Sequence, residues 1–124
     1  MSANFIVTGE GARSFAEEWI AAWNSHDLDR IMSHYADDVV LTSPVAAKLL
    51  NLTDGTVKGK QAMRSYFQKG LGAFPQPRFE LIEVMWGMTS VVLYYGNHRG
   101  TKSGEFMEFD CDGKVVRVVA NYSG

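Results

Sequence analysis

The chain has 124 residues, of which 46% are hydrophobic and 21% charged, with a formal net charge of −2. This balance excludes an intrinsically disordered chain, and the lack of a basic excess argues against a nucleic-acid-binding protein. The length predicts one domain over residues 1–124, with its core over about 12–122.

Cysteine usage and hydropathy indicate the compartment. The single cysteine, Cys111, cannot form an internal disulfide and fits a reducing compartment. Residues 1–10 lack the basic start of a signal peptide, and no apolar run is long enough to predict a membrane span. We therefore expect a cytoplasmic protein whose partners include neither membrane nor nucleic acid.

Two helices are predicted near the N-terminus. Phe15, Trp19 and Trp23 recur at helical spacing, which predicts a helix over about 12–24. Asp27 is a candidate N-cap for a second helix, which we expect to run to Tyr35. The short link between them predicts a tight corner.

The middle of the chain predicts a strand, a long loop and a third helix. Residues 39–42 form a β-prone run that Pro44 ends. Residues 45–58 are expected to form an apolar loop, which either covers a cavity as a lid or contacts a second subunit. A third helix is predicted after Gly59, with these residues buried: Ala62, Met63, Tyr66, Phe67 and Leu71.

The last third of the chain changes to the two-residue period of strands. A turn is predicted at 74–77, followed by strands at 79–86, 91–95, 105–110 and 115–122. Helices first and antiparallel strands last predict an α+β fold, in which a curved, mostly antiparallel sheet packs on three N-terminal helices.

The Asp112-Gly113 dipeptide predicts a two-residue turn, which sets the register of the last hairpin. One face is then expected to carry the pairs Cys111–Lys114, Phe109–Val116, Met107–Val118 and Glu105–Ala120. Glu108 is expected to face Arg117 on the other side, as an opposite-charge pair suited to solvent.

This register makes Glu105 the one acid on an apolar strand face. Burial disfavours a charged carboxylate, so we expect a raised pKa for Glu105. Such a group is a candidate general acid, general base or hydrogen-bond donor. The alternative is a solvated or ion-paired Glu105 at the open end of the sheet. The inference also depends on the turn, because a three-residue bulged loop would shift the register by one and send Glu105 outward.

Five motifs follow one another along the chain. They are residues 19–31, which begin Trp19-x-x-x-Trp23-Asn24, then residues 35–39, Ser43-Pro44, residues 59–62 and residues 109–115. This series resembles the SnoaL-like, nuclear transport factor 2-like superfamily over nearly the whole chain. The resemblance implies a cone in which three helices close over a curved sheet, with a mostly apolar cavity at its open end. It also implies a homodimer joined through the outer face of the sheet.

The resemblance allows a comparison with the ketosteroid isomerase mechanism of this superfamily. Ser43 falls where that mechanism needs a carboxylate base, Trp19 where it needs a tyrosine, and Glu105 at the acid of the oxyanion hole. A serine hydroxyl cannot take a proton from carbon without a base of its own, and an indole N–H cannot titrate. Steroid isomerisation by that mechanism is therefore disfavoured. A limonene-type epoxide hydrolase needs an Asp-Arg-Asp set that the sequence does not place, whereas a polyketide cyclase needs only one carboxylate.

We expect a cavity for a small, largely apolar or ring-containing metabolite, with no cofactor. The substrate-binding residues implied are Trp19, Trp23, Ser43, Met107 and Tyr122. Glu105 is the candidate catalytic acid of an isomerase/cyclase-type or hydrolase-type enzyme, and His98 is a second candidate. The three histidines and one cysteine show no metal-ligand spacing, so no metal is expected.

Two alternatives to an enzyme stay open. One is a non-catalytic module of the same fold that binds a small molecule or associates as a dimer. The other is a purely structural dimer, which predicts a cavity filled by side chains.

Overall fold

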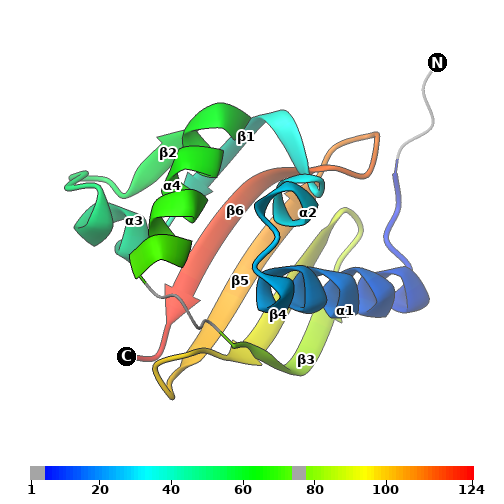
Figure 1. The fold of residues 1–124 in the computed structure, drawn as a ribbon. Coiled ribbons are helices and arrows are strands. Elements are labelled where there is room, and N and C mark those ends of the chain that lie inside the picture. The colour runs from blue at the N-terminus through cyan, green and yellow to red at the C-terminus, as the bar shows by residue number, and fades with distance from the viewer. Residues whose placement is uncertain (1–4, 74–77) are drawn as a thin grey trace.

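The computed structural model describes residues 5–73 and 78–124 (Figure 1). Its elements are α1 (Gly9–Ser25), α2 (Leu28–Met32), β1 (Tyr35–Thr42), α3 (Pro44–Leu49), β2 (Thr56–Lys58), α4 (Lys60–Ala73), β3 (Glu80–Trp86), β4 (Ser90–Gly96), β5 (Lys102–Phe109) and β6 (Val115–Tyr122). The turn predicted at 74–77 lies outside the described residues.

The described strands form one curved, open sheet in the order β2-β1-β6-β5-β4-β3. The β1–β6 pair is parallel and the other pairs are antiparallel. Helices α1, α2 and α4 lie on one side of this sheet, with α1 toward β3 and α4 toward β1 (Figure 1). The predicted α+β class and mostly antiparallel curved sheet are confirmed.

The two N-terminal helices begin at capping residues. Thr8 caps α1 and accepts a hydrogen bond from the Gly11 N–H at 3.0 Å, so α1 starts earlier than predicted. Asp27 caps α2 as predicted, accepting from the Arg30 N–H at 3.2 Å. The second helix is shorter than predicted, because Tyr35 opens β1.

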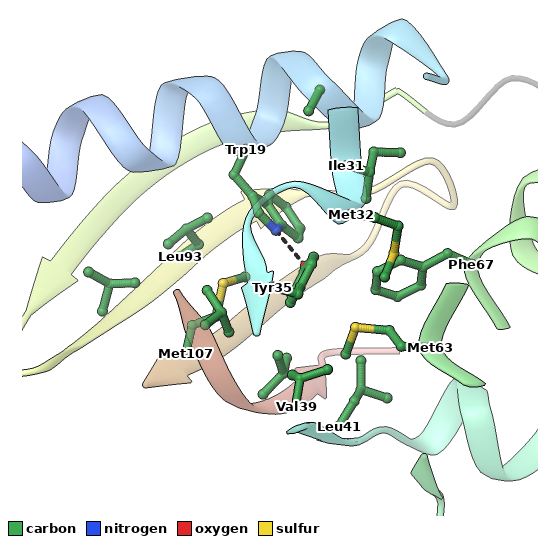
Figure 2. Packing of buried hydrophobic residues seen from close by; sticks show 14 of the residues in the cluster. Trp19, Ile31, Met32, Tyr35, Val39, Leu41, Met63, Phe67, Leu93 and Met107 are labelled. Atoms are coloured by element: carbon green, nitrogen blue, oxygen red, sulfur yellow. Dashed lines mark hydrogen bonds between the residues drawn. The ribbon is translucent and has the colours of Figure 1, made fainter. Parts of the chain in front are cut away.

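Tyr35 ties the first helix to the sheet. It is 1% exposed, and its hydroxyl accepts a hydrogen bond from Trp19 Nε1 at 2.9 Å (Figure 2). Burial raises the pKa of Tyr35, so the phenol stays neutral. Asp37 and Asp38 are exposed within β1, beside the register shift between β1 and β6.

The segment 45–58 is not the loop that we predicted. Ser43 caps α3 by accepting from the Val45 N–H at 3.1 Å, and Pro44 starts the helix. Strand β2 then pairs with β1. Gly55 lies between α3 and β2 and has a left-handed φ of 64°. A Cβ at this position would lie 2.6 Å from the Ser43 carbonyl oxygen. Only glycine fits this junction without distortion.

The last hairpin has the predicted register by a different route. Glu105 pairs with Ala120, Met107 with Val118 and Glu108 with Arg117, as expected. The turn is longer than two residues, since the Asp110 N–H donates to the Lys114 carbonyl at 2.8 Å.

This longer turn pairs Phe109 with Val115, not with Val116, and the predicted Cys111–Lys114 pair is not formed. A bulge between Glu108 and Phe109 then restores the register. Val115 is buried in the place that we predicted for Val116, which is half-buried.

The core lies between α1, α2 and α4 and the inner face of the sheet. A row of paired residues crosses its centre from Val91 through Met107 and Val118 to Leu41, each at most 4% exposed. Met107 and Leu41 of this row are labelled in Figure 2. On α4, Met63, Tyr66 and Phe67 are buried as predicted and Leu71 is partly buried, whereas Ala62 is exposed because the helix turns that face outward.

Candidate functional site

A pocket of about 700 Å³ opens at one end of the inner sheet face. Its walls come from α1, α3 and α4, from β1, β4, β5 and β6, from Phe79 before β3, and from the 97–99 turn between β4 and β5. Of the sequence-predicted residues, it brings together Trp19, Trp23, Ser43, His98, Glu105 and Tyr122.

Glu105 lies inside this pocket on β5 and is 9% exposed. It shares the inner face with Leu93 of β4 and Ala120 of β6, its partners on either side. Burial raises the pKa of Glu105 to about 7, and a hydrogen bond to the carboxylate acts in the opposite direction. The side chain can therefore hold or release a proton near neutral pH.

The hydrogen bond to Glu105 comes from Tyr95 on β4. Its hydroxyl donates to Glu105 Oε1 at 2.9 Å, and this contact is buried. Burial and the neighbouring Glu105 charge raise the pKa of Tyr95, which keeps the phenol protonated as a donor. With Oε1 held in this way, Oε2 has no hydrogen-bond partner among the described residues and is the oxygen available to a ligand.

Besides Tyr95, the hydroxyl-bearing residues Ser43, Tyr66, Ser103 and Tyr122 line the pocket. Ser43 Oγ lies 3.5 Å from the Tyr122 hydroxyl, and Tyr66 lines the same pocket from α4. Burial raises the pKa of Tyr66 to about 12 and also raises that of Tyr122. Both phenols are therefore neutral hydrogen-bond donors at physiological pH. Ser43 caps α3, and its hydroxyl has the Val45 N–H and the Tyr122 hydroxyl as hydrogen-bond partners among the described residues, so it supplies a hydrogen bond rather than a nucleophile.

Aromatic rings form the wall opposite the sheet. Trp19 stacks with Phe79 at a centroid distance of 6.0 Å, and Trp23 packs edge-on against Phe67 at 4.8 Å. Trp23 Nε1 is buried without a hydrogen-bond partner among the described residues. These flat surfaces suit a ring-containing ligand.

The rim of the pocket is basic. Lys48 on α3 and His98 and Arg99 after β4 are exposed lining residues. Burial and the nearby Arg99 charge lower the pKa of His98, so its imidazole is neutral at pH 7. Arg99 Nη2 donates to the Gly124 carbonyl at 2.7 Å, and its guanidinium lies 5.6 Å from the centre of the Tyr122 ring.

Met107 is not among the pocket-lining residues. It is fully buried in the core row, one position deeper on the same strand face as Glu105 (Figure 2). The structure does not bring it to the pocket with the other predicted substrate-binding residues, because side chains of α1, α2 and α4 cover that part of the sheet.

The sequence interpretation missed Tyr95, Ser103, Lys48 and Arg99. Tyr95 and Ser103 are paired inner-face residues, and counting two positions back from Glu105 and two positions forward from Leu93 would have found them. Lys48 and Arg99 carry no local signal, because only the packing of α3 and of the 97–99 turn brings them to one rim.

Other kinds of site lack support in the part of the chain that the structure describes. No group of three or more His, Cys, Asp or Glu side chains there could hold a metal ion. His34 instead contacts Glu18, with Nε2 3.3 Å from Oε2. Among residues 5–73 and 78–124, no helix is both long and apolar enough to cross a membrane.

Comparisons with known proteins are consistent with this architecture. A solved SnoaL-like protein of unknown function from Burkholderia thailandensis is 36% identical, with a TM-score of 0.93 over 97% of this chain and 100% of that one. AclR from Streptomyces galilaeus, proposed to be a hydroxylase, is 25% identical with a TM-score of 0.72, over 94% of this chain and 77% of that one.

A protein from Kribbella flavida, proposed to be a ketosteroid isomerase, shares the fold at 18% identity, with a TM-score of 0.72 over 93% of this chain and 79% of that one. A search of the curated proteins finds no match. The profile of the SnoaL-like domain matches residues 16–121. The chain therefore belongs to the SnoaL-like domain family.

Proposed function

We propose that this protein is an acid–base enzyme of the isomerase or cyclase type, which moves a proton on a small, largely apolar, ring-containing molecule. The observation that carries the proposal is Glu105, a single buried carboxyl group at the floor of an apolar pocket with a pKa of about 7. A general acid–base works best when its pKa lies near the operating pH.

Each group around Glu105 has a part in this proposal. Glu105 Oε2 takes a proton from a carbon next to a ring carbonyl and returns it at a second position, while Tyr95 holds Oε1. The neutral hydroxyls of Tyr66 and Tyr122 supply hydrogen bonds to the carbonyl oxygen as it gains negative charge. Trp19 and Trp23 bound the space for the ring.

Deuterium exchange into 2-tetralone, a fused-ring ketone, tests the proposal without knowledge of the natural substrate. NMR should show that the wild-type protein accelerates exchange next to the carbonyl. Glu105→Gln keeps the shape of the side chain but cannot take the proton, so we expect a loss of about 100- to 10,000-fold.

Glu108→Gln, the same change on the opposite face of β5, is the matched control and should retain full exchange. Retained exchange in Glu105→Gln, or no acceleration by the wild-type protein, would contradict the proposal.

A second candidate function is ligand binding without chemistry. The lining of the pocket favours this candidate. Glu105 is the only acid among the described lining residues, and Ser43 lines the pocket in place of a second acid–base group. This candidate predicts that 2-tetralone binds, seen as a change in tryptophan fluorescence, while its exchange is not accelerated.

We also propose that the protein forms a homodimer through the outer face of its sheet. An apolar row of cross-strand neighbours runs over this face from Met85 through Val92 and Phe106 to Val119, and Met85 is 50% exposed. Light scattering should give twice the chain mass for the wild type and a monomer for Phe106→Arg. A monomeric wild type would contradict the dimer.

A further inference from the structure

The pocket has two chemically different ends. Its floor holds Glu105, Tyr95 and Ser103, all buried, whereas its rim carries the exposed side chains of Lys48 and Arg99. Both rim side chains are cationic at neutral pH. Between the two ends lies the aromatic wall formed by Trp19, Trp23 and Phe79.

The rim cations do not act on the buried acid. The pKa of Glu105 reflects burial and the Tyr95 hydrogen bond, while the charge of Arg99 acts on Tyr122 instead. Tyr122 is two residues beyond Ala120, the partner of Glu105, which separates the two levels by about 7 Å along β6. Arg99, whose guanidinium lies over the Tyr122 ring, is therefore about one strand step beyond the level of Glu105.

The rim cations also have capacity for a ligand. Lys48 forms none of the ion pairs found among the described residues, which join Arg30 and His34 to Glu18 and Arg64 to Asp29. Arg99 uses Nη2 to bond the Gly124 main-chain oxygen, and its guanidinium forms none of the ion pairs with Asp or Glu side chains found among the described residues. A guanidinium with several donors prefers an anionic partner, above all a carboxylate.

We propose that the ligand of this pocket is an amphipathic ring acid, whose carboxylate binds Lys48 and Arg99 at the rim while its ring extends along the aromatic wall toward Glu105. The inference rests on the proposed function only in taking this pocket as the ligand site. A neutral apolar ligand would make no use of the two rim charges. The proposal thus selects ring-containing carboxylates over the corresponding neutral compounds.

A matched pair of probes tests this selection. Isothermal titration calorimetry at neutral pH and low salt would compare 2-naphthoate with 2-naphthamide, which have the same ring and differ in charge. We expect 2-naphthoate to bind about tenfold more tightly. Equal affinity for the two probes, or no binding of either, would overturn the proposal.

Variants that remove one rim charge at a time test which residues produce the preference for 2-naphthoate. Lys48→Gln and Arg99→Gln should each reduce the preference for 2-naphthoate by about threefold, with little change in 2-naphthamide affinity. Arg99 also contacts Tyr122 and Gly124, so Arg99→Gln removes structural contacts as well as a charge. Lys48→Gln breaks no described hydrogen bond and therefore reports the loss of charge alone. Arg13→Gln, an exposed position on α1 away from the pocket, is the control and should keep the full preference.

Comparing Glu105→Gln with the two rim variants separates this inference from the proposed function. Glu105→Gln should lose proton exchange but keep the preference for 2-naphthoate, because the rim is unchanged. If exchange persists in Glu105→Gln while the preference holds, the acid–base assignment fails and the anion-binding rim stands. An unchanged preference in both rim variants would overturn the rim assignment whatever the exchange result.

Discussion

Two neighbouring rows on the inner face of the sheet have opposite characters. One row, centred on Met107 between Val91 and Val118, is sealed and fully apolar. The next row, centred on Glu105 between Leu93 and Ala120, borders an open pocket of about 700 Å³. Because alternate residues of one strand share a face, Met107 and Glu105 differ by a single step of about 7 Å.

The difference comes from what lies over each row. Above Met107, residues such as Trp19, Ile31 and Met63 fill the space from three helices (Figure 2). Beside Glu105, side chains of α1, α3, α4 and the 97–99 turn surround the space without filling it. A strand position thus becomes core or site through its covering layer.

The largest effect that tests this contrast is loss of core packing at Met107. Met107→Ala removes a side chain with 0% exposure, and we expect a loss of about 2–5 kcal/mol in the free energy of unfolding. Urea denaturation measures it. Met88→Ala is the control, since Met88 is 70% exposed and its loss should change stability by less than about 0.5 kcal/mol. A similar cost at both positions would break the distinction between the rows.

The next effect tests the buried charge of Glu105. Its pKa is about 7 in the fold against 4.5 ordinarily, so the folded protein binds the proton more tightly than the unfolded chain does. Stability should therefore fall as the pH rises from 4.5 to 7 and stay level above, by about 3 kcal/mol in total.

Glu105→Gln cannot ionise and should lack this loss, so it gains on the wild type as the pH rises through that window. Urea melts of both proteins across the window measure the difference. Glu108→Gln should show less than about 1 kcal/mol of such change, because Glu108 faces Arg117 on the outer side. A wild type and a Glu105→Gln variant whose stabilities stay parallel with pH would show that Glu105 is not buried as a charge.

The smallest expected effect sharpens the role of Tyr95. Its hydrogen bond favours the ionised form of Glu105, so Tyr95→Phe should raise the pKa of Glu105 above about 7. A carbon-13 NMR titration of the Glu105 carboxyl group measures the shift. Tyr94→Phe, on the outer face of the same strand, should leave it unchanged. An unchanged midpoint in Tyr95→Phe would remove Tyr95 from the site.

Much of the candidate site followed from alternation along β5 and β6. The placement of Glu105 on the inner face opposite Ala120 is correct, although the Asp112-Gly113 turn is not the two-residue turn that predicted it. The longer turn and the bulge after Glu108 shift the register in opposite directions. Asp112 and Gly113 indicate a turn from the local sequence. The bulge instead depends on which side chain packs into the core, and that side chain is Val115.

The start of α3 was predictable from the sequence, although we predicted a loop there. Ser43-Pro44 is an N-cap followed by a first-turn proline, which indicates a helix start, yet the apolar run behind it suggested a loop. A six-residue helix is too short to be stable by itself. Its packing is what forms it, including the junction at Gly55 that holds the loop against the Ser43 carbonyl.

The sequence by itself determined the fold class and the strands of the last third, because these follow from periodicity and from steric rules within a few residues. The inner-face position of Glu105 was predicted correctly, but the bulge after Glu108 that produces it depends on tertiary packing. Only the tertiary structure decided that Met107 is core while Glu105 borders a pocket, and that Tyr95 holds its carboxylate. It alone brought Lys48 and Arg99 to one rim. Burial, and therefore the pKa of Glu105, depends on layers contributed by segments far apart in the chain, which no local pattern encodes.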